Sequence, residues 1–122
     1  MRHAIGQPIN LPQGESLWLQ VRKLCITGTE ASSLLNEATW DTLDKNKKAP
    51  INTFKSKAMV RGNYLEPIAR AALSRKTGMM FKPVVFMSKK ERMLASLDGI
   101  TVGRLATCEI KCPEKGQYSD TW

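Results

Sequence analysis

The order of predicted elements along the 122-residue chain indicates an α+β fold, in which N-terminal helices pack on a mostly antiparallel central sheet. Two observations predict it. Helical patterns occupy the chain up to residue 76, and segments that read as strands follow. A chain of this length is enough for one small core, so we expect residues 1–122 to form a single domain.

The N-terminal part is expected to hold an extended arm and two short helices. Residues 1–13 contain glycine and prolines and show little periodicity, as an arm would. Residues 16–23 read as a short helix. Thr27 and Glu30 have the spacing of a capping box, so a second short helix should begin there and end near Asn36.

The middle of the chain is expected to be a surface loop followed by a long helical segment. Residues 39–52 are polar and rich in lysine, which favours a loop. Residues 54–76 are helical in pattern, but Gly62 and Pro67 interrupt it and predict a kink or a break between two helices. Gly78 fits the C-cap.

The last third of the chain is expected to form the sheet. The segments that read as strands are residues 79–87, 93–98, 100–102 and 106–112. Pro83 inside the first of them predicts an edge or a bulge. Little sequence follows the last strand to cover the second face of the sheet, so we expect a polypeptide that is cut short or completed by a partner chain.

Composition narrows the function. Nineteen Lys and Arg against eleven Asp and Glu give a net charge of +8, which favours a polyanionic partner, although a merely soluble basic protein remains equally open. There is no apolar run that could span a membrane and no signal peptide, so a cytoplasmic protein without membrane contact is expected. Three cysteines indicate a reducing compartment, and a single histidine makes a zinc site improbable.

Charged residues near the end of the chain have a pattern that suits metal chemistry. In a strand, Glu109 and Lys111 would share one face while Cys108, Ile110 and Cys112 occupy the other. Asp98 lies on the preceding predicted strand. Carboxylates close in space repel each other unless a cation lies between them, and oxygen ligands suit Mg²⁺ or Mn²⁺. Such an ion with a lysine beside it could hydrolyse a phosphodiester. A plain surface hairpin with one Glu–Lys pair is the alternative.

A third acid could join this group. Glu66 lies on the long helical segment, and a helix packed on the sheet could bring its carboxylate to the metal. Arg70 lies one turn further along on the same face, so a simple ion pair between Glu66 and Arg70 is the alternative for both residues.

Four blocks of sequence occur in the order and approximate spacing of a known family. They are Trp18-Leu19-Gln20-Val21-Arg22 with Ile26-Thr27-Gly28-Thr29-Glu30-Ala31; Gly62 with Glu66, Ala69 and Arg70; Ala95-Ser96-Leu97-Asp98-Gly99-Ile100; and Glu109-Ile110-Lys111-Cys112-Pro113. Together they resemble the YqaJ-like viral recombinase and lambda phage exonuclease family, within the PD-(D/E)XK nuclease superfamily. Leu97 stands where that family usually has proline, and the family continues well beyond its Glu-x-Lys strand.

The resemblance implies a restriction-endonuclease-like core and a Mg²⁺ site, with Mn²⁺ as a substitute. It implies that Glu66, Asp98 and Glu109 bind the metal, together with the backbone carbonyl of Ile110, and that Lys111 is the catalytic lysine. It also implies a site for the 5′-phosphate of DNA, made by the residues at the matching positions, which are Arg22, Thr29 and Ser96. Arginine and hydroxyl side chains are suitable phosphate donors.

The expected function is therefore Mg²⁺-dependent hydrolysis of DNA by a phage-type recombination nuclease, more an exonuclease acting from a 5′ end than an endonuclease. The expected partner is double-stranded DNA with free ends, in the cytoplasm of the host cell if a phage encodes the chain. A homo-oligomer or a recombination partner protein is compatible with the resemblance. Two alternatives stay open: a catalytically incomplete DNA-binding module, and a structural subunit that needs a partner chain.

Overall fold

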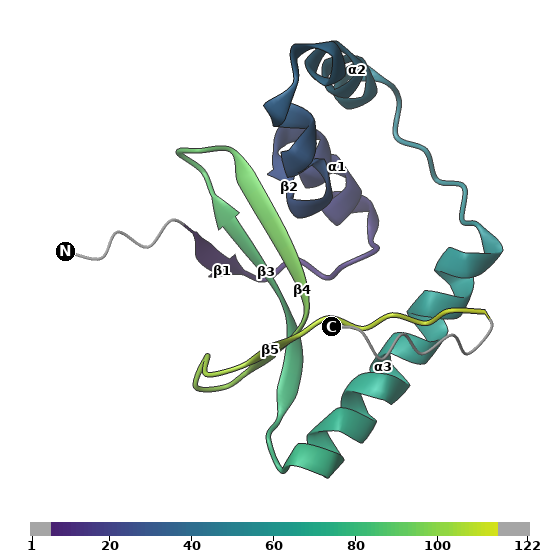
Figure 1. Cartoon of the computed structure of the whole chain (residues 1–122), viewed down its shortest axis with the longest axis vertical. Coiled ribbons are helices and arrows are strands. Elements are labelled where there is room, and N and C mark those ends of the chain that lie inside the picture. Colours follow the sequence, from purple (N-terminus) through teal and green to yellow (C-terminus); the bar gives the residue numbers. More distant parts are fainter. Residues whose placement is uncertain (1–5, 115–122) are drawn as a thin grey trace. The chain divides into compact units, whose positions relative to one another are not determined.

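Helices come first and most strands come last in the structure, a computed structural model that describes residues 6–114 (Figure 1). The elements are β1 (Gln7–Ile9), α1 (Ser16–Leu24), β2 (Ile26–Thr27), the 3₁₀ helix η1 (Gly28–Leu35), α2 (Glu37–Lys48), α3 (Lys57–Thr77), β3 (Phe81–Ser88), β4 (Met93–Thr101) and β5 (Thr107–Cys108). The predicted α+β class is confirmed. Residues 1–5 of the predicted arm lie outside the described residues.

The strands of the described chain form one open, mostly antiparallel sheet. Its order is β1-β3-β4-β2, and β5 also pairs with β4. β1 runs antiparallel to β3, β5 runs antiparallel to β4, and β2 runs parallel to β4. In the described part of the predicted arm, residues 7–9 form an edge strand opposite residues 85–87 of β3. Pro83 lies outside that paired segment, where its missing N–H removes no bond to β1.

The described residues divide into two compact units. Unit 1 contains residues 6–52 together with Pro83–Leu97, and unit 2 contains Thr53–Lys82 together with residues 98–114. β3 and β4 therefore each contribute residues to both units.

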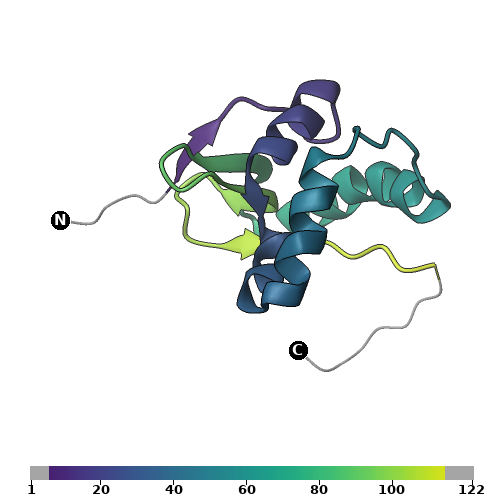
Figure 2. The ribbon, with the colours of Figure 1, turned by 90° about the horizontal axis from the view of Figure 1, so that it is seen from above.

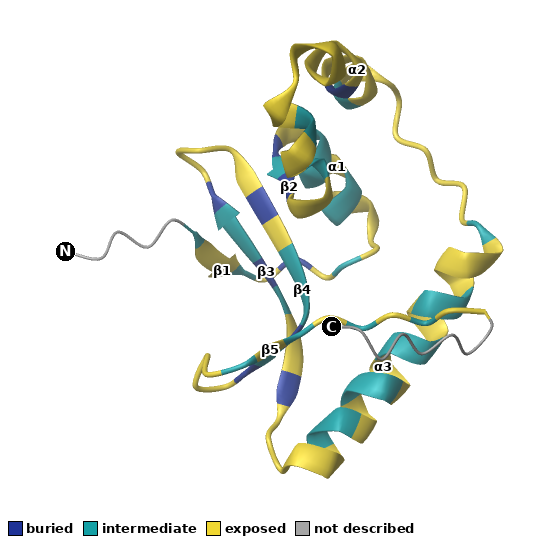
Figure 3. Ribbon diagram, in the orientation of Figure 1, coloured by how far each residue is buried: buried dark blue, intermediate teal, exposed yellow. Residues whose placement is uncertain are grey.

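Unit 1 holds the larger apolar core. Its buried residues include positions on β3 and β4 (Figure 3). The core residues are Leu11, Cys25, Val85 and Leu94, against which Ile9, Trp18, Val21 and Met87 pack. The three helical segments α1, η1 and α2 lie together in this unit (Figure 2). The predicted helix at residues 16–23 is confirmed as α1, and it is attached to the core through the partly buried Trp18 and Val21.

The predicted loop at residues 39–52 is wrong, because most of it belongs to helix α2. Asn36 caps this helix, since its side-chain oxygen accepts a hydrogen bond from Ala38 N at 2.8 Å. Leu43 is buried, and the indole of Trp40 donates to the carbonyl of Leu34 at 2.6 Å. A cap, one buried leucine and one indole hydrogen bond are enough to order a segment whose other side chains are mostly polar.

Unit 2 is built around α3, a single helix over its whole length. It passes through Gly62 and Pro67, so the predicted break is wrong. The residues after Pro67 are mostly Ala, Leu, Arg and Lys, which are strong helix formers, and they continue the helix past the proline. Ser56 caps its start, and Gly78 ends it with a φ of 71°, which confirms the predicted C-cap.

The end of the sheet differs from the prediction in length. β4 is one strand where two were predicted, and β5 pairs only at Thr107–Cys108 rather than over residues 106–112. The backbone N–H of Ile110 donates to the Asp98 carboxylate at 2.7 Å, so a side chain takes the place of a ladder partner there. Within residues 6–114, no helix has both the length and the apolar character needed to cross a membrane.

Candidate functional site

The acid cluster, which we define as Glu66, Asp98, Glu109 and Lys111, lies within unit 2. Asp98 is held from two sides. Its carboxylate accepts the Ile110 N–H at 2.7 Å, and its backbone carbonyl accepts a hydrogen bond from Nε of Arg70 at 2.5 Å. The side chain of Asp98 is thereby fixed beside the peptide of Ile110, and its backbone is fixed to α3.

Glu66 is brought to Asp98 by the same arginine. Arg70 forms an ion pair with the Glu66 carboxylate one helical turn away, as the sequence alternative proposed. Burial raises the pKa of Glu66, the charge of Asp98 raises it further, and Arg70 opposes both effects without cancelling them. The two carboxylates therefore interact, and the structure brings Glu66, Asp98 and the Ile110 backbone together.

Glu109 and Lys111 are arranged differently. Their side chains form an ion pair with each other, and they remain 65% and 72% exposed respectively. The hydrogen bond to Glu109 and the charge of that carboxylate raise the pKa of Lys111, so the lysine is protonated. Among residues 6–114, no three His, Cys, Asp or Glu side chains lie close enough to hold a metal ion. The structure thus brings two of the three predicted acidic ligands together and leaves Glu109 with Lys111.

The predicted alternation around Lys111 is present although the strand is short. Glu109 and Lys111 are exposed, while the intervening Ile110 and the flanking Cys108 and Cys112 are half-buried. The charged residues therefore lie on the solvent side of this segment, as the pattern predicted. Arg61 on α3 donates from Nε to the carbonyl of Cys112 at 3.1 Å, which attaches the segment to the helix.

The glycine after Asp98 is required by close packing. A Cβ atom on Gly99 would overlap Sγ of Cys108 and lie 3.2 Å from Cβ of Phe81. Gly99 pairs directly with Cys108, so any side chain there would push β5 away from Asp98. Burial, followed by the charge of Asp98, raises the pKa of the Cys108 thiol, so this cysteine stays protonated and contributes no thiolate to the cluster.

The basic cluster, which we define as Arg22, Thr29 and Ser96 with Trp18, lies within unit 1. Trp18 connects two of the predicted phosphate residues. Its indole Nε1 donates to Oγ of Ser96 at 3.0 Å, and the Arg22 guanidinium lies 4.5 Å from the centre of its ring. Because Ser96 accepts from the indole, its own hydroxyl proton is left to donate elsewhere. The stacked ring restrains the arginine, and the cation–π attraction stabilises that position.

Thr29 lies in the first turn of η1. Its Oγ1 is 3.2 Å from Oγ1 of the buried Thr27, and the Glu30 carboxylate accepts the N–H of Thr27 at 2.9 Å. The predicted capping box is therefore confirmed. The structure links Arg22 with Ser96 through Trp18, and it fixes Thr29 separately, beside Thr27 at the start of η1.

Sequence reasoning missed two residues that support these clusters. Lys47 of α2 donates to the Arg22 carbonyl at 2.5 Å, and Gln13 donates from Nε2 to the Leu97 carbonyl at 3.1 Å, next to Asp98 along the chain. The signal for Lys47 was present in the lysine-rich stretch, but the stretch was interpreted as a loop. Gln13 belongs to the arm, where nothing in the local sequence marks a partner.

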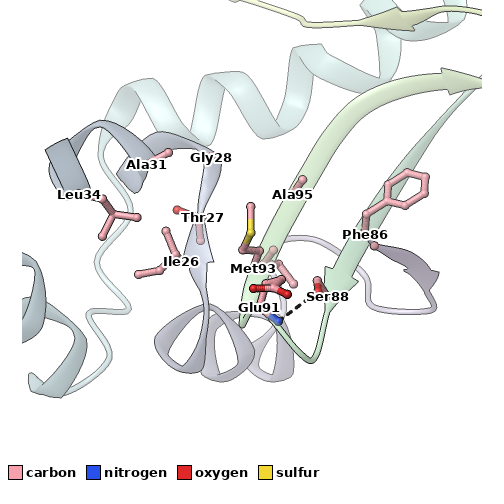
Figure 4. A pocket seen from close by; sticks show the side chains of 12 residues that line it. Ile26, Thr27, Gly28, Ala31, Leu34, Phe86, Ser88, Glu91, Met93 and Ala95 are labelled. Atoms are coloured by element: carbon pink, nitrogen blue, oxygen red, sulfur yellow. Dashed lines mark hydrogen bonds between the residues drawn. The ribbon is translucent and has the colours of Figure 1, made fainter. Parts of the chain in front are cut away.

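A cavity of about 470 Å³ lies in the same unit and includes Thr27 and Ala95 in its lining (Figure 4). Its walls come from β2, η1, β3 and β4, and they are mainly apolar, with Ile26, Leu34 and Phe86 among them. At its rim, Glu91 N donates to Oγ of Ser88 at 3.2 Å. Walls of this composition suit an apolar group and offer little to a phosphate.

Comparison with known proteins gives one clear result. No curated protein matches the chain well enough to be counted as a relative. The family model described as the YqaJ-like viral recombinase domain matches residues 17–122, which includes every residue of both clusters. The chain therefore belongs to the YqaJ-like viral recombinase domain family, a family of phage-type recombination nucleases.

Proposed function

We propose that this protein is a Mg²⁺-dependent DNA nuclease that hydrolyses phosphodiester bonds from a 5′ end. The observation that carries the proposal is that Arg70 binds both the Glu66 carboxylate and the backbone carbonyl of Asp98, so that the charge of Asp98 contributes to the raised pKa of Glu66. Two carboxylates held in mutual repulsion form a site whose charge a divalent cation would relieve.

The donors in this site fit Mg²⁺. They are all oxygens: the carboxylates of Glu66 and Asp98, with the carbonyl of Ile110 on the peptide segment tied to Asp98. Mg²⁺ usually keeps several waters and is bound through one or two carboxylates plus phosphate oxygens of the substrate, so a pair of acids is a sufficient starting set. Glu109, on the exposed segment two residues from Lys111, is the proposed third ligand. When bound, the ion would supply positive charge to the phosphate and acidify water.

The chain's own residues would complete the chemistry. Lys111 is exposed and protonated, so it can donate to a phosphate oxygen and stabilise the negative charge that develops there. Arg70 holds both Glu66 and the backbone of Asp98, so it positions two ligands from one helix. We assign Glu66, Asp98, Glu109 and Lys111 as the catalytic group on this basis.

The basic cluster would bind the terminal 5′-phosphate. Arg22 provides a planar fork of N–H donors, and the hydroxyls of Thr29 and Ser96 add two more. The indole that donates to Ser96 leaves the serine proton available, which supports a donor role for this side chain. Recognition of a terminal phosphate is what favours exonuclease over endonuclease action.

The test is cleavage of linear duplex DNA in the presence of Mg²⁺. Wild type should degrade 5′-phosphorylated duplex, while Asp98→Ala and Lys111→Ala should not, and a closed circular duplex should resist all three proteins. Equal cleavage by the three proteins would contradict the assignment of the catalytic group. Cutting of the closed circle would show an endonuclease instead.

One observation favours a second function, a DNA-binding module without turnover. Glu109 pairs with Lys111 rather than with the other two acids, so among the described residues the ligand set has two carboxylates. This function predicts duplex binding that weakens steeply as salt rises, that needs no Mg²⁺ and that survives Asp98→Ala. Binding of this kind without cleavage by wild type would replace the nuclease proposal.

A further inference from the structure

Lys47 is the most enclosed of the lysines at the end of α2. Its side chain is 16% exposed, whereas the neighbouring Lys48 is 75% exposed and pairs only with Asp44 on its own helix. Lysine side chains rarely lose this much contact with water unless the ammonium group is paired. The ammonium of Lys47 has two partners from outside α2, so its burial has a structural cause.

The first partner is the end of α1. Nζ of Lys47 donates to the backbone carbonyl of Arg22 at 2.5 Å. That carbonyl belongs to the last turn of α1, where carbonyl groups have no partner within the helix. A positive charge is also favourable at a helix C-terminus. Lys47 therefore caps α1 at the residue that carries a guanidinium of the basic cluster.

The second partner is the start of η1. Nζ of Lys47 lies 2.7 Å from the Glu30 carboxylate, and the same carboxylate accepts the N–H of Thr27 at 2.9 Å. Burial would raise the pKa of Glu30, but the hydrogen bonds from Lys47 and Thr27 lower it below its usual value. Glu30 is thus held ionised, and its charge connects Lys47 to the turn that contains Thr29.

We propose that Lys47 is a positioning residue for the phosphate site, resting on the proposed function of the basic cluster. It holds both ends of the segment from Arg22 to Glu30, which contains β2 and two of the three proposed phosphate donors, Arg22 and Thr29. Fixing these two points sets the spacing between the guanidinium and the threonine hydroxyl before DNA arrives. The two partners of the Lys47 ammonium are both protein groups, so the proposed role is indirect and acts through Arg22 and Glu30.

The test compares Lys47→Met with Lys48→Met, a matched loss of one charge at the adjacent position. The measurement is the ratio of affinities for a duplex with a 5′-phosphate and the same duplex with a 5′-hydroxyl, taken without divalent ions. Lys47→Met should reduce this ratio by about tenfold, because small displacements of positioned groups cost large factors. Lys48→Met should leave the ratio at the wild-type value, and Lys47→Arg should restore most of it.

The outcomes separate this inference from the function on which it rests. A wild type that ignores the 5′-phosphate would overturn both. If wild type prefers the 5′-phosphate and Lys47→Met shows the same affinity ratio as wild type, the positioning role alone is overturned. The same conclusion follows if Lys48→Met lowers the ratio as much as Lys47→Met does. If Lys47→Met does not fold, Glu30→Gln provides the test. Glutamine keeps an oxygen that can accept from Thr27 N but removes the charge partner of Lys47, so the affinity ratio should fall. An unchanged ratio would refute the positioning role.

Discussion

The two charged clusters of this protein differ in how well their groups are satisfied. In the basic cluster, the indole of Trp18 restrains both Ser96 and Arg22, and Lys47 holds the backbone beneath. In the acid cluster, the charge of Asp98 raises the pKa of Glu66, and Arg70 pairs with the Glu66 carboxylate but reaches only the backbone carbonyl of Asp98. The side chains of one cluster are held in place by neighbouring protein groups, whereas the carboxylates of the other repel each other.

The difference corresponds to what each cluster is proposed to bind. A phosphate must find its donors already in place, since ordering them at the moment of binding costs conformational entropy. A cation instead gains affinity from carboxylates that repel each other in its absence. No buried side-chain nitrogen or oxygen of residues 6–114 lacks a hydrogen-bond partner, so the strain in the acid cluster is one of charge rather than of missing hydrogen bonds.

The largest effect is expected from Asp98→Asn, which tests whether charge or hydrogen bonding matters in the acid cluster. Asparagine keeps an oxygen that can accept the Ile110 N–H but removes the negative charge. Turnover of linear duplex with Mg²⁺ should fall on the order of 10³-fold, because several kcal/mol of transition-state stabilisation depend on the metal. Binding of 5′-phosphorylated duplex without metal should be unchanged. If Asp98→Asn cuts as fast as wild type and Asp98→Ala does not, the residue is needed for its hydrogen bond alone.

A smaller effect of a different kind is expected from Arg22→Gln in the basic cluster. Hydrogen bonds to a charged group contribute about 1.5–3 kcal/mol, so the KM for 5′-phosphorylated duplex should rise roughly 10- to 100-fold. The kcat at saturating DNA should stay near wild type, because the acid cluster is untouched. Arg22→Lys keeps the charge but not the planar fork, so its KM should lie between those of wild type and Arg22→Gln. If Arg22→Gln lowered kcat and left KM constant, Arg22 would act in the chemical step, and the separation between a binding cluster and a catalytic cluster would be wrong.

The elements that carry Arg22 and Thr29 were better predicted than those that carry the acid cluster, and the reason is local. The Thr27–Glu30 capping box is a short-range signal, and the helix that carries Trp18 and Arg22 shows its apolar periodicity directly in the sequence. Each of these elements is specified by residues within a few positions of one another.

The acid cluster depends on contacts that sequence patterns do not encode. Period-two alternation correctly predicted which side of the chain Glu109 and Lys111 occupy. It could not reveal that Asp98 takes the Ile110 N–H, which ends the strand at Cys108. The helix that carries Lys47 was missed for a related reason, since its anchor Leu43 is a single buried residue in a polar stretch. Long-range packing decided both cases.

The smallest expected effect, on stability alone, measures the strain in the acid cluster directly. The pKa of Glu66 in the folded protein is raised above its ordinary value of 4.5, so the folded state holds this proton more tightly than the unfolded state does. The stability that this group contributes is fully present below about pH 4.5 and is lost as the pH rises through the raised pKa. Urea unfolding of wild type across this range should show that loss, and Glu66→Gln, which has no charge to repel Asp98, should not. Mg²⁺ should recover the lost stability in wild type and recover less in Glu66→Gln, since a ligand that binds only the folded state stabilises it. Parallel pH profiles for the two proteins would mean that Arg70 already neutralises the pair, and the contrast between the two clusters would then disappear.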